Sequence, residues 1–262
     1  MSCGNSPSDL ELAETGISNC DNYSSCNEGA DADLELSSIT PGDERRGSSD
    51  PQILLVTEAP DEESSNESAY MGTTSRRMKA IFCDDEYGIS IDQGCDDPFP
   101  TFLERNRIYA TSAIKCFVDG DISSSERYVI QSCRERFLDS QISAMPNLEL
   151  IIPMGTVAAC SLLRRSPSSI SITSIIGQMD RGIRPEGTND TTVVVFPHPS
   201  GINPYANPPI IDEDDGPTWG SYKHQFQGAL RYTRDLLRDL GYDVMDEDPD
   251  SWEPPEGLFK FF

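Results

Sequence analysis

The stretch QILLVTEAPDEESSNESAYMG, residues 52–72, decides the fold that we expect for this chain. It opens with the apolar run ILLV, and such a run bounded by turn residues is typical of a strand buried on both faces of a parallel sheet. Pro60 cannot continue a ladder of backbone hydrogen bonds, so the chain should leave the sheet there. Ligands bind at the carboxyl ends of strands in open parallel sheets. The following loop, with Glu58, Tyr70 and Gly72, is therefore a candidate site, although an acidic surface loop is the simpler interpretation.

Three more apolar runs repeat this pattern further along the chain. They predict strands at residues 107–114, 148–154 and 191–196. Amphipathic patterns between and after these runs predict helices, most clearly at 126–145 and 219–240. Strands that alternate with helices predict an α/β fold, a three-layer α/β/α sandwich with a central, mostly parallel four-stranded sheet.

The two ends of the chain differ from this middle part in composition. Residues 1–50 are rich in Ser, Asp, Glu and Gly, which is typical of a largely disordered segment. We expect a folded domain over residues 51–242 and an acidic, aromatic tail over residues 243–262. No apolar run reaches the length of a membrane span and no signal-peptide pattern is present. We therefore expect a cytoplasmic protein without membrane contact, and a monomer.

The chain carries a large negative charge. Asp and Glu total 45 against 20 Lys and Arg, which gives a formal net charge of −25. Taken alone, this balance argues against a nucleic-acid partner, because binding phosphates requires cations. The alternative is a halophilic protein, because the Debye length is only about 3 Å in 1 M salt and self-repulsion is then screened. In that case the positions of the remaining Arg residues, such as Arg164 and Arg165, matter more than the total charge.

Residues that can do chemistry follow three of the predicted strands. Glu58 follows the first strand, Ser112 and Cys116 lie at the end of the second, and His198 follows the fourth in the turn HPSG. Because parallel strands end at one edge of a sheet, these residues should share a rim. The chain has only two His, and the simpler interpretation of His198 is a surface residue in a turn. We expect His224, within the last predicted helix, to be structural or exposed.

Six short motifs occur in a defined order: TEAP at 57–60, AYMGTTS at 69–75, YATSAIKC at 109–116, CxxxFLxxQI at 133–142, MGxxA at 154–158 and HPS at 198–200. Together they resemble the motifs of the uracil-DNA glycosylase superfamily, particularly its iron–sulfur branches, families 4 and 5. The resemblance covers about residues 50–240. It implies a DNA glycosylase that excises uracil or another deaminated base from DNA in base-excision repair.

The resemblance also implies roles for single residues. Glu58 or Asp61 would position the attacking water or offset the positive charge of the sugar. His198 would donate a hydrogen bond to the negative charge that develops on the base. Tyr70 would stack on the extruded base, and the backbone around Ala59 would contact it.

Further positions of the substrate site are implied in the same way, namely Gly72, Ser112, Ser200 and Asn203. The loop from Ser200 to Asn203 would press into the minor groove of DNA. Ser112 stands where the family has an Asn that reads the edge of uracil. A hydroxyl cannot make the two hydrogen bonds of an amide, so the identity of the excised base stays open. Asn203 is an alternative source of an amide.

Cysteine is the remaining candidate for chemistry, with eight residues in the chain. In a cytoplasmic protein we expect metal ligands or core residues rather than disulfides. The resemblance implies a four-iron, four-sulfur (4Fe-4S) cluster, for which it indicates the ligands Cys20, Cys26, Cys116 and Cys133. Cys20 and Cys26 are spaced more widely than in the family, and Cys3 is another candidate for an N-terminal ligand. The alternatives are that Cys116 and Cys133 are buried without a metal, or that Cys83 and Cys95 form another pair.

Two other functions stay open at this point. The first is a protein that keeps the fold but binds DNA or a partner protein without catalysis, and the departures from the family motifs at Asp61 and Ser112 favour it. The second is a different α/β hydrolase that acts on a nucleotide or nucleoside. The chain lacks a Gly-rich phosphate-binding loop, which argues against phosphate chemistry.

Overall fold

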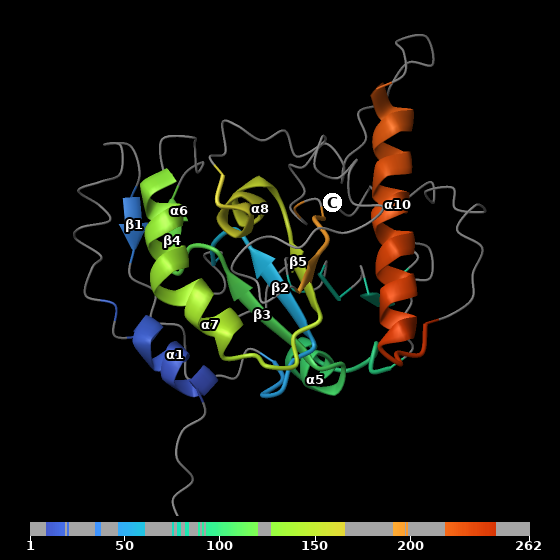
Figure 1. The fold of residues 1–262 in the computed structure, drawn as a ribbon, viewed down its shortest axis with the longest axis horizontal. Helices are drawn as coiled ribbons and strands as arrows, with labels where there is room; N and C mark the ends of the chain where they lie inside the picture. Colours follow the sequence, from blue (N-terminus) through green and yellow to red (C-terminus); the bar gives the residue numbers. More distant parts are fainter. Residues whose placement is uncertain are drawn as a thin grey trace, which may run out of the picture.

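A four-stranded sheet between two layers of helices forms the centre of the protein in the computed structural model (Figure 1). The structure describes residues 9–18, 20, 35–37, 47–60, 75, 78, 79, 82, 83, 89, 91, 93–119, 127–165, 191–196, 198 and 218–244. The strands are β2 (Ile53–Thr57), β3 (Ile108–Ser112), β5 (Leu150–Pro153) and β6 (Thr192–Val193). They lie in the order β3-β2-β5-β6, and every neighbouring pair is parallel. The predicted α/β fold is therefore confirmed.

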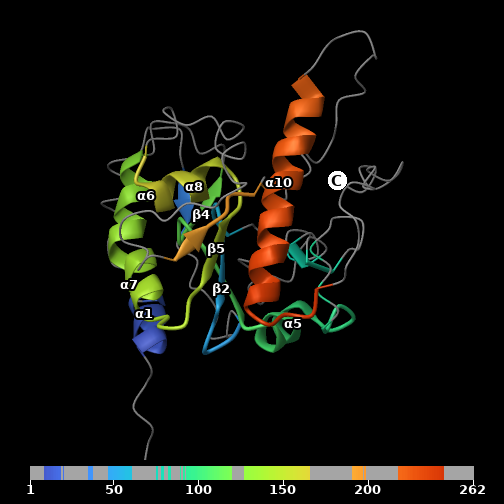
Figure 2. The same ribbon diagram turned by 45° about the vertical axis from the view of Figure 1, so that its right-hand side comes forward.

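The helices cover both faces of this sheet. One layer holds α1 (Asp9–Ser18), α6 (Arg127–Cys133), the π-helical segment η3 (Arg134–Leu138), α7 (Asp139–Ser143) and α8 (Thr156–Leu163). The other holds α5 (Phe99–Arg105) and α10 (Thr218–Asp239). Figure 2 shows the two layers on opposite sides of the strands.

Each face of the sheet has its own apolar core, because successive side chains of a strand point to opposite faces. Leu54 and Val56 pack with Leu10 and Ile142 of the α1/α7 layer. Ile53 and Leu55 pack with residues of α5 and α10 on the opposite face, including Phe102, Leu230 and Leu237. All five residues of β2 are buried, as the continuous apolar run predicts.

The helix predicted at 126–145 is present, but it is not a regular α-helix along its length. It consists of α6, the π-helical segment η3 and α7 in direct succession. A π segment widens the helix by one residue per turn and changes which side chains face the core. Here it buries Arg134 together with Phe137 and Leu138.

Part of the N-terminal segment is joined to this domain. Helix α1 packs against α7 and η3, and β1 (Glu35–Ser37) pairs antiparallel with β4 (Phe117–Asp119). The expected domain limits stay a prediction. Within the described residues, no helix combines the length and the apolar character that crossing a membrane requires.

The expectation that the cysteines avoid disulfides is wrong for one pair. Cys83 and Cys95 form a disulfide, with a Cα–Cα distance of 5.5 Å. A backbone hydrogen bond from Ile91 N–H to the Phe82 carbonyl (2.7 Å) holds the two segments together. The sequence separation of 12 residues did not reveal this tertiary contact.

Candidate active site at the carboxyl ends of the strands

The predicted rim exists in the structure. Glu58 directly follows β2, Ser112 ends β3, Gly155 follows β5, and His198 lies beyond β6. The parallel pairing brings these positions to one edge of the sheet, the edge to which the strand arrows point in Figure 1. Ala59 lies beside Glu58, half-buried and packed against the core.

Strands β2 and β3 form one half of the rim. Thr57 pairs with Ser112 in the sheet register, and their hydroxyl oxygens are 3.0 Å apart. The pairing continues beyond the strands, because the N–H of Ile114 donates to the carbonyl of Glu58 (2.9 Å). The backbone of Glu58 is thereby held in place while its side chain stays half-buried. Ser112 is itself buried, with its hydroxyl directed across the strands to Thr57.

The other half of the rim depends on a glycine. Gly155 adopts a φ of 90° at the N-cap of α8, and its N–H donates to the carbonyl of Phe196 (2.9 Å). A Cβ at Gly155 would lie 2.9 Å from Cβ and 3.2 Å from Cδ2 of His198. Any larger residue would therefore collide with the histidine and adopt an unfavourable backbone conformation. The imidazole of His198 occupies the space that the missing side chain leaves.

The strand order sets the distance across the rim. Only β5 separates β2 from β6, and neighbouring strands are about 4.8 Å apart. Two such steps place the backbones of Glu58 and His198 roughly 10 Å apart, on either side of Gly155. The other predicted substrate and catalytic residues lie outside the described part of the chain, namely Asp61, Tyr70, Gly72, Ser200 and Asn203.

A buried lysine supports the β3 side of the rim. Lys115 is only 4% exposed. Its Nζ donates to the carbonyl of Ser112 (2.6 Å), to Oγ1 of Thr111 (2.7 Å) and to Oε1 of Gln141 (2.8 Å). Lys115 thereby fixes the backbone at the position where the chain leaves the sheet.

The same hydrogen-bond network continues to the N-terminal helix. Gln141 donates through Nε2 to the hydroxyl of Tyr109 (3.3 Å), which donates to Glu14 of α1 (2.5 Å). Lys115 and Gln141 both lie in the sequence motifs quoted above, but the sequence did not indicate a role for either residue. The available signal was the polar Gln141 on an otherwise apolar face of the predicted helix.

Two of the predicted cluster ligands lie in one core. Cys133 is buried at the end of α6, and the half-buried Cys116 packs against the same apolar cluster. Cys20 follows α1, with its N–H bonded to the Ile17 carbonyl (3.1 Å), whereas Cys26 lies outside the described residues. Over the residues that the structure describes, no three His, Cys, Asp or Glu side chains gather as a metal site. The 4Fe-4S cluster therefore stays a prediction.

The family model of the Uracil DNA glycosylase superfamily matches residues 44–213. The chain belongs to this superfamily. The matched segment contains all four strands of the sheet and every described residue of the rim. No curated protein sequence matches the chain. Membership of the uracil-DNA glycosylase superfamily fits the observed sheet order and the position of Glu58, Gly155 and His198 at its carboxyl edge.

The contact between Gly155 and His198 predicts the effect of Gly155→Ala. The substitution should lower the free energy of unfolding by about 1–3 kcal/mol through backbone strain, and displace the imidazole in addition. Urea denaturation measures the first effect. The position of the His198 ring signals in an NMR spectrum measures the second, since the chain has only two His.

Gly241→Ala is the matched control for this variant. Gly241 has a similar φ of 86°, but no atom lies within 4 Å of the added Cβ. It should show the strain without any change at His198. Equal destabilisation and unmoved His198 signals in both variants would contradict the proposed contact.

Replacing Lys115 by Met should lower the free energy of unfolding by about 1–3 kcal/mol, because buried acceptors on Ser112 and Gln141 lose their donor. Chemical denaturation at constant KCl measures this loss. Lys79→Met is the control, because the structure shows one bond from Lys79 Nζ, to the Asp97 carbonyl (2.5 Å), in a partly buried site. The role of Lys115 is refuted if the two variants lose the same stability.

Proposed function

We propose that this protein is a DNA glycosylase that excises uracil or another deaminated base in base-excision repair. The observation that carries this proposal is the rim itself. Glu58 and His198 lie on the same edge of the sheet, at the ends of strands on either side of the one that Gly155 follows, and the chain belongs to the uracil-DNA glycosylase superfamily. A carboxylate and an imidazole about 10 Å apart at the backbone can approach a single extruded base and its sugar from two sides.

The proposed reaction is the hydrolysis of the bond between the base and C1′ of the sugar. As that bond breaks, its electron pair stays with the base, and the sugar becomes positively charged. Glu58, or Asp61, would offset this charge and hold the water that adds its oxygen to C1′. His198 would donate a hydrogen bond to the oxygen of the departing base. The proton released by the water neutralises the base.

The excised base need not be uracil. In the structure the hydroxyl of Ser112 is 3.0 Å from that of Thr57, and a single hydroxyl offers fewer contacts than the amide found there in the family. Recognition would then depend on stacking by Tyr70 and on contacts from Gly72, Ser200 or Asn203. Hypoxanthine and xanthine are therefore candidate substrates beside uracil.

Assays of base release test this function, in molar KCl because we propose that the charge of −25 reflects adaptation to salt. Oligonucleotides carry uracil, hypoxanthine or xanthine in single- or double-stranded form. His198→Ala should lower the rate of release by about 10²–10³-fold, as expected for a lost oxyanion donor, and Glu58→Gln by about 10²–10⁴-fold. His224→Ala, which removes the other histidine, is the control and should keep the wild-type rate.

DNA binding distinguishes catalysis from the alternative function, a binding protein without activity. The departure at Ser112 favours that alternative, because the site has lost the amide that reads uracil. Intact DNA binding by His198→Ala, together with lost release, would support catalysis. Wild-type protein that binds DNA and releases none of the three bases would refute the glycosylase.

We further propose that the protein belongs to the iron–sulfur branches and holds a 4Fe-4S cluster. Support comes from Cys116 and Cys133 in one apolar core and from Cys20 at the end of α1, which packs on the same layer. Together with Cys26 they would supply the four thiolates that such clusters require. The cluster would link the N-terminal segment to the core.

Protein purified without oxygen should therefore contain about four iron atoms per chain and show iron–sulfur charge-transfer absorbance. Cys116→Ala or Cys133→Ala should lose both signals. Cys160→Ala is the control, because burial raises the pKa of this thiol to about 11 and so disfavours the thiolate that binds metal. Wild-type protein without iron, or equal loss in the Cys160 variant, would remove the cluster.

A further inference from the structure

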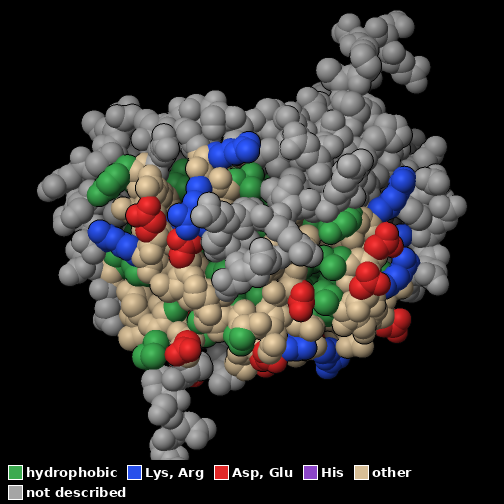
Figure 3. Space-filling view, viewed as in Figure 1, with side chains coloured by type: hydrophobic (Ala, Val, Ile, Leu, Met, Phe, Trp, Pro, Cys, Tyr) green, Lys and Arg blue, Asp and Glu red, His purple; other side chains and the backbone are tan. Residues whose placement is uncertain are grey.

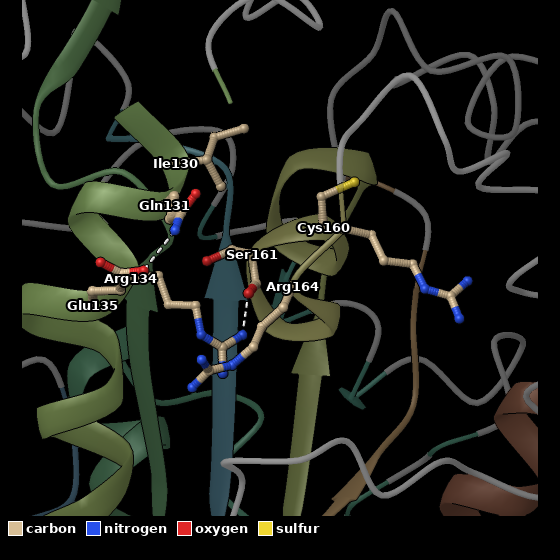
Figure 4. Close-up of a pocket in the computed structure, with 8 residues that line it drawn as sticks. Ile130, Gln131, Arg134, Glu135, Cys160, Ser161 and Arg164 are labelled. Carbon is tan, nitrogen blue, oxygen red and sulfur yellow. Dashed lines mark hydrogen bonds between the residues drawn. The ribbon is translucent and has the colours of Figure 1, made fainter. Parts of the chain in front are cut away.

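A second polar site lies between the helices α6 and α8 (Figure 4). It is a pocket of about 100 Å³, and the polar side chains that line it are Gln131, Arg134, Glu135, Ser161, Arg164 and Arg165. None of them belongs to the rim of Glu58 and His198.

Positive charge dominates this pocket. Asp139 pairs with both Arg134 (Nε–Oδ1, 2.9 Å) and Arg164 (Nη2–Oδ2, 3.3 Å), so one carboxylate serves two guanidinium groups. Glu135 accepts a hydrogen bond from Nε2 of Gln131 (2.7 Å). Arg165 makes no ion pair within the described part of the chain.

The neighbouring thiol adds no negative charge to this set. Burial raises the pKa of Cys160 to about 11, so the side chain stays neutral at physiological pH. Three cations thus face two carboxylates, and the pocket keeps a net positive charge.

Two buried polar groups in the pocket lack hydrogen-bond partners. Arg134 is only 2% exposed, and its Nη1 donates to the carbonyl of Ser161, but its Nη2 has no hydrogen-bond partner in the described structure. The hydroxyl of Ser161, also in a residue 2% exposed, has none either. A buried donor without a partner costs about 1–3 kcal/mol, and such groups call for a ligand or an ordered water. An oxyanion would satisfy both groups, since a guanidinium binds the oxygens of an anion in a fork.

The local backbone around the pocket is also unusual. Arg134 opens the π segment η3, and π segments are frequent at functional sites. Arg164 ends α8 with a left-handed φ of 52°, a conformation that favours glycine. Its side chain stays 53% exposed while it contacts Asp139. Figure 3 shows basic side chains at the surface over this region of the molecule.

We propose that this pocket binds one phosphate group of the DNA backbone, a short distance along the strand from the extruded base. The proposal rests on the glycosylase function proposed above. Helix α8 connects the two sites, because it begins next to Gly155, which contacts His198, and ends at the pocket. Its eight residues span about 12 Å. The rise of about 3.4 Å per nucleotide is measured along the duplex axis, and because the strand also winds around that axis, successive phosphates lie roughly 6–7 Å apart. The phosphate therefore belongs to a nucleotide about two steps from the excised base.

The overall charge explains why such a pocket is needed. A chain with a net charge of −25 repels DNA unless cations gather where the backbone passes. A pocket with unpaired donors holds one phosphate in a defined place, which the exposed end of a surface side chain does not. It would set the register of the DNA strand relative to the catalytic rim.

The salt dependence of DNA binding tests this assignment in two variants. Arg165→Ala removes a cation without a described ion pair, and Arg164→Gly removes a cation while its φ of 52° suits glycine. Each should lower the slope of log K against log[KCl] by about one, as expected for one lost phosphate contact. Fluorescence anisotropy measures K over the KCl range in which circular dichroism shows folded protein.

Arg105→Ala is the control for the change in charge. Arg105 pairs with Asp97 (3.2 Å) at the end of α5, at the opposite edge of the sheet from the rim (Figure 1). It should leave the slope unchanged. If the Arg165 and Arg105 variants change the slope by the same amount, or not at all, the pocket does not hold a phosphate of DNA.

Neutral methylphosphonate linkages locate the contact. Placed singly along the oligonucleotide, one of them, about two nucleotides from the damaged base, should weaken binding to wild-type protein. The same linkage should have no further effect on Arg165→Ala. Equal effects of that linkage on both proteins would overturn the proposal.

Titration with inorganic phosphate in a calorimeter distinguishes a free anion from the DNA backbone. Weak binding that DNA displaces supports the proposal. Binding that persists when DNA is bound assigns the pocket to free phosphate and overturns it. Base release is measured separately. If Arg165→Ala leaves the slope unchanged while His198→Ala abolishes base release, only the phosphate site is refuted. If Arg165→Ala lowers the slope but the wild-type protein releases no base, only the glycosylase function is refuted.

Discussion

The pairing of β2 with a parallel strand on each side is the constraint on which the rest of the structure depends. β3 and β5 bind both edges of β2 in register, and helices cover both of its faces. A strand held in this way ends at the carboxyl edge of the sheet. There its last carbonyl groups can accept hydrogen bonds from the backbone that follows a neighbouring strand. The hydrogen bond from the N–H of Ile114 to the carbonyl of Glu58 is one result, and it fixes the backbone of Glu58 where the central strand β2 ends.

The rim combines two different ways of holding a functional side chain. On one side the position of the side chain depends on the available space, because Gly155 has no side chain and so leaves room for the ring of His198. On the other side the backbone position depends on buried hydrogen bonds. Lys115 donates to the carbonyl of Ser112 and to Gln141, which in turn donates to Tyr109. Both arrangements leave little freedom at the points where strands become loops. Rigid ends of this kind suit the proposed function, which requires side chains held in fixed positions around one extruded base.

Because the protein is strongly acidic, its basic side chains can attract a negatively charged partner only over short distances. With 45 acidic residues against 20 basic ones, a long-range attraction to DNA is absent at low salt. Arg134 shows the local solution. Burial lowers the pKa of this guanidinium and Asp139 opposes that effect, so the group keeps its charge inside the α6/α8 layer. If the protein binds DNA as proposed, a few arginines held by partners in this way can do locally what a basic surface does in DNA-binding proteins.

The sequence by itself determined the fold class, the four strands and the rim, because buried parallel strands need continuous apolar runs and their carboxyl ends share one edge. Only the tertiary structure decided the Cys83–Cys95 disulfide, the π segment at Arg134 and the network around Lys115. Each of these depends on contacts between segments far apart in the chain or on a local change of helical register. Periodicity and spacing record which face of an element is apolar, but they do not record which polar atoms meet inside it.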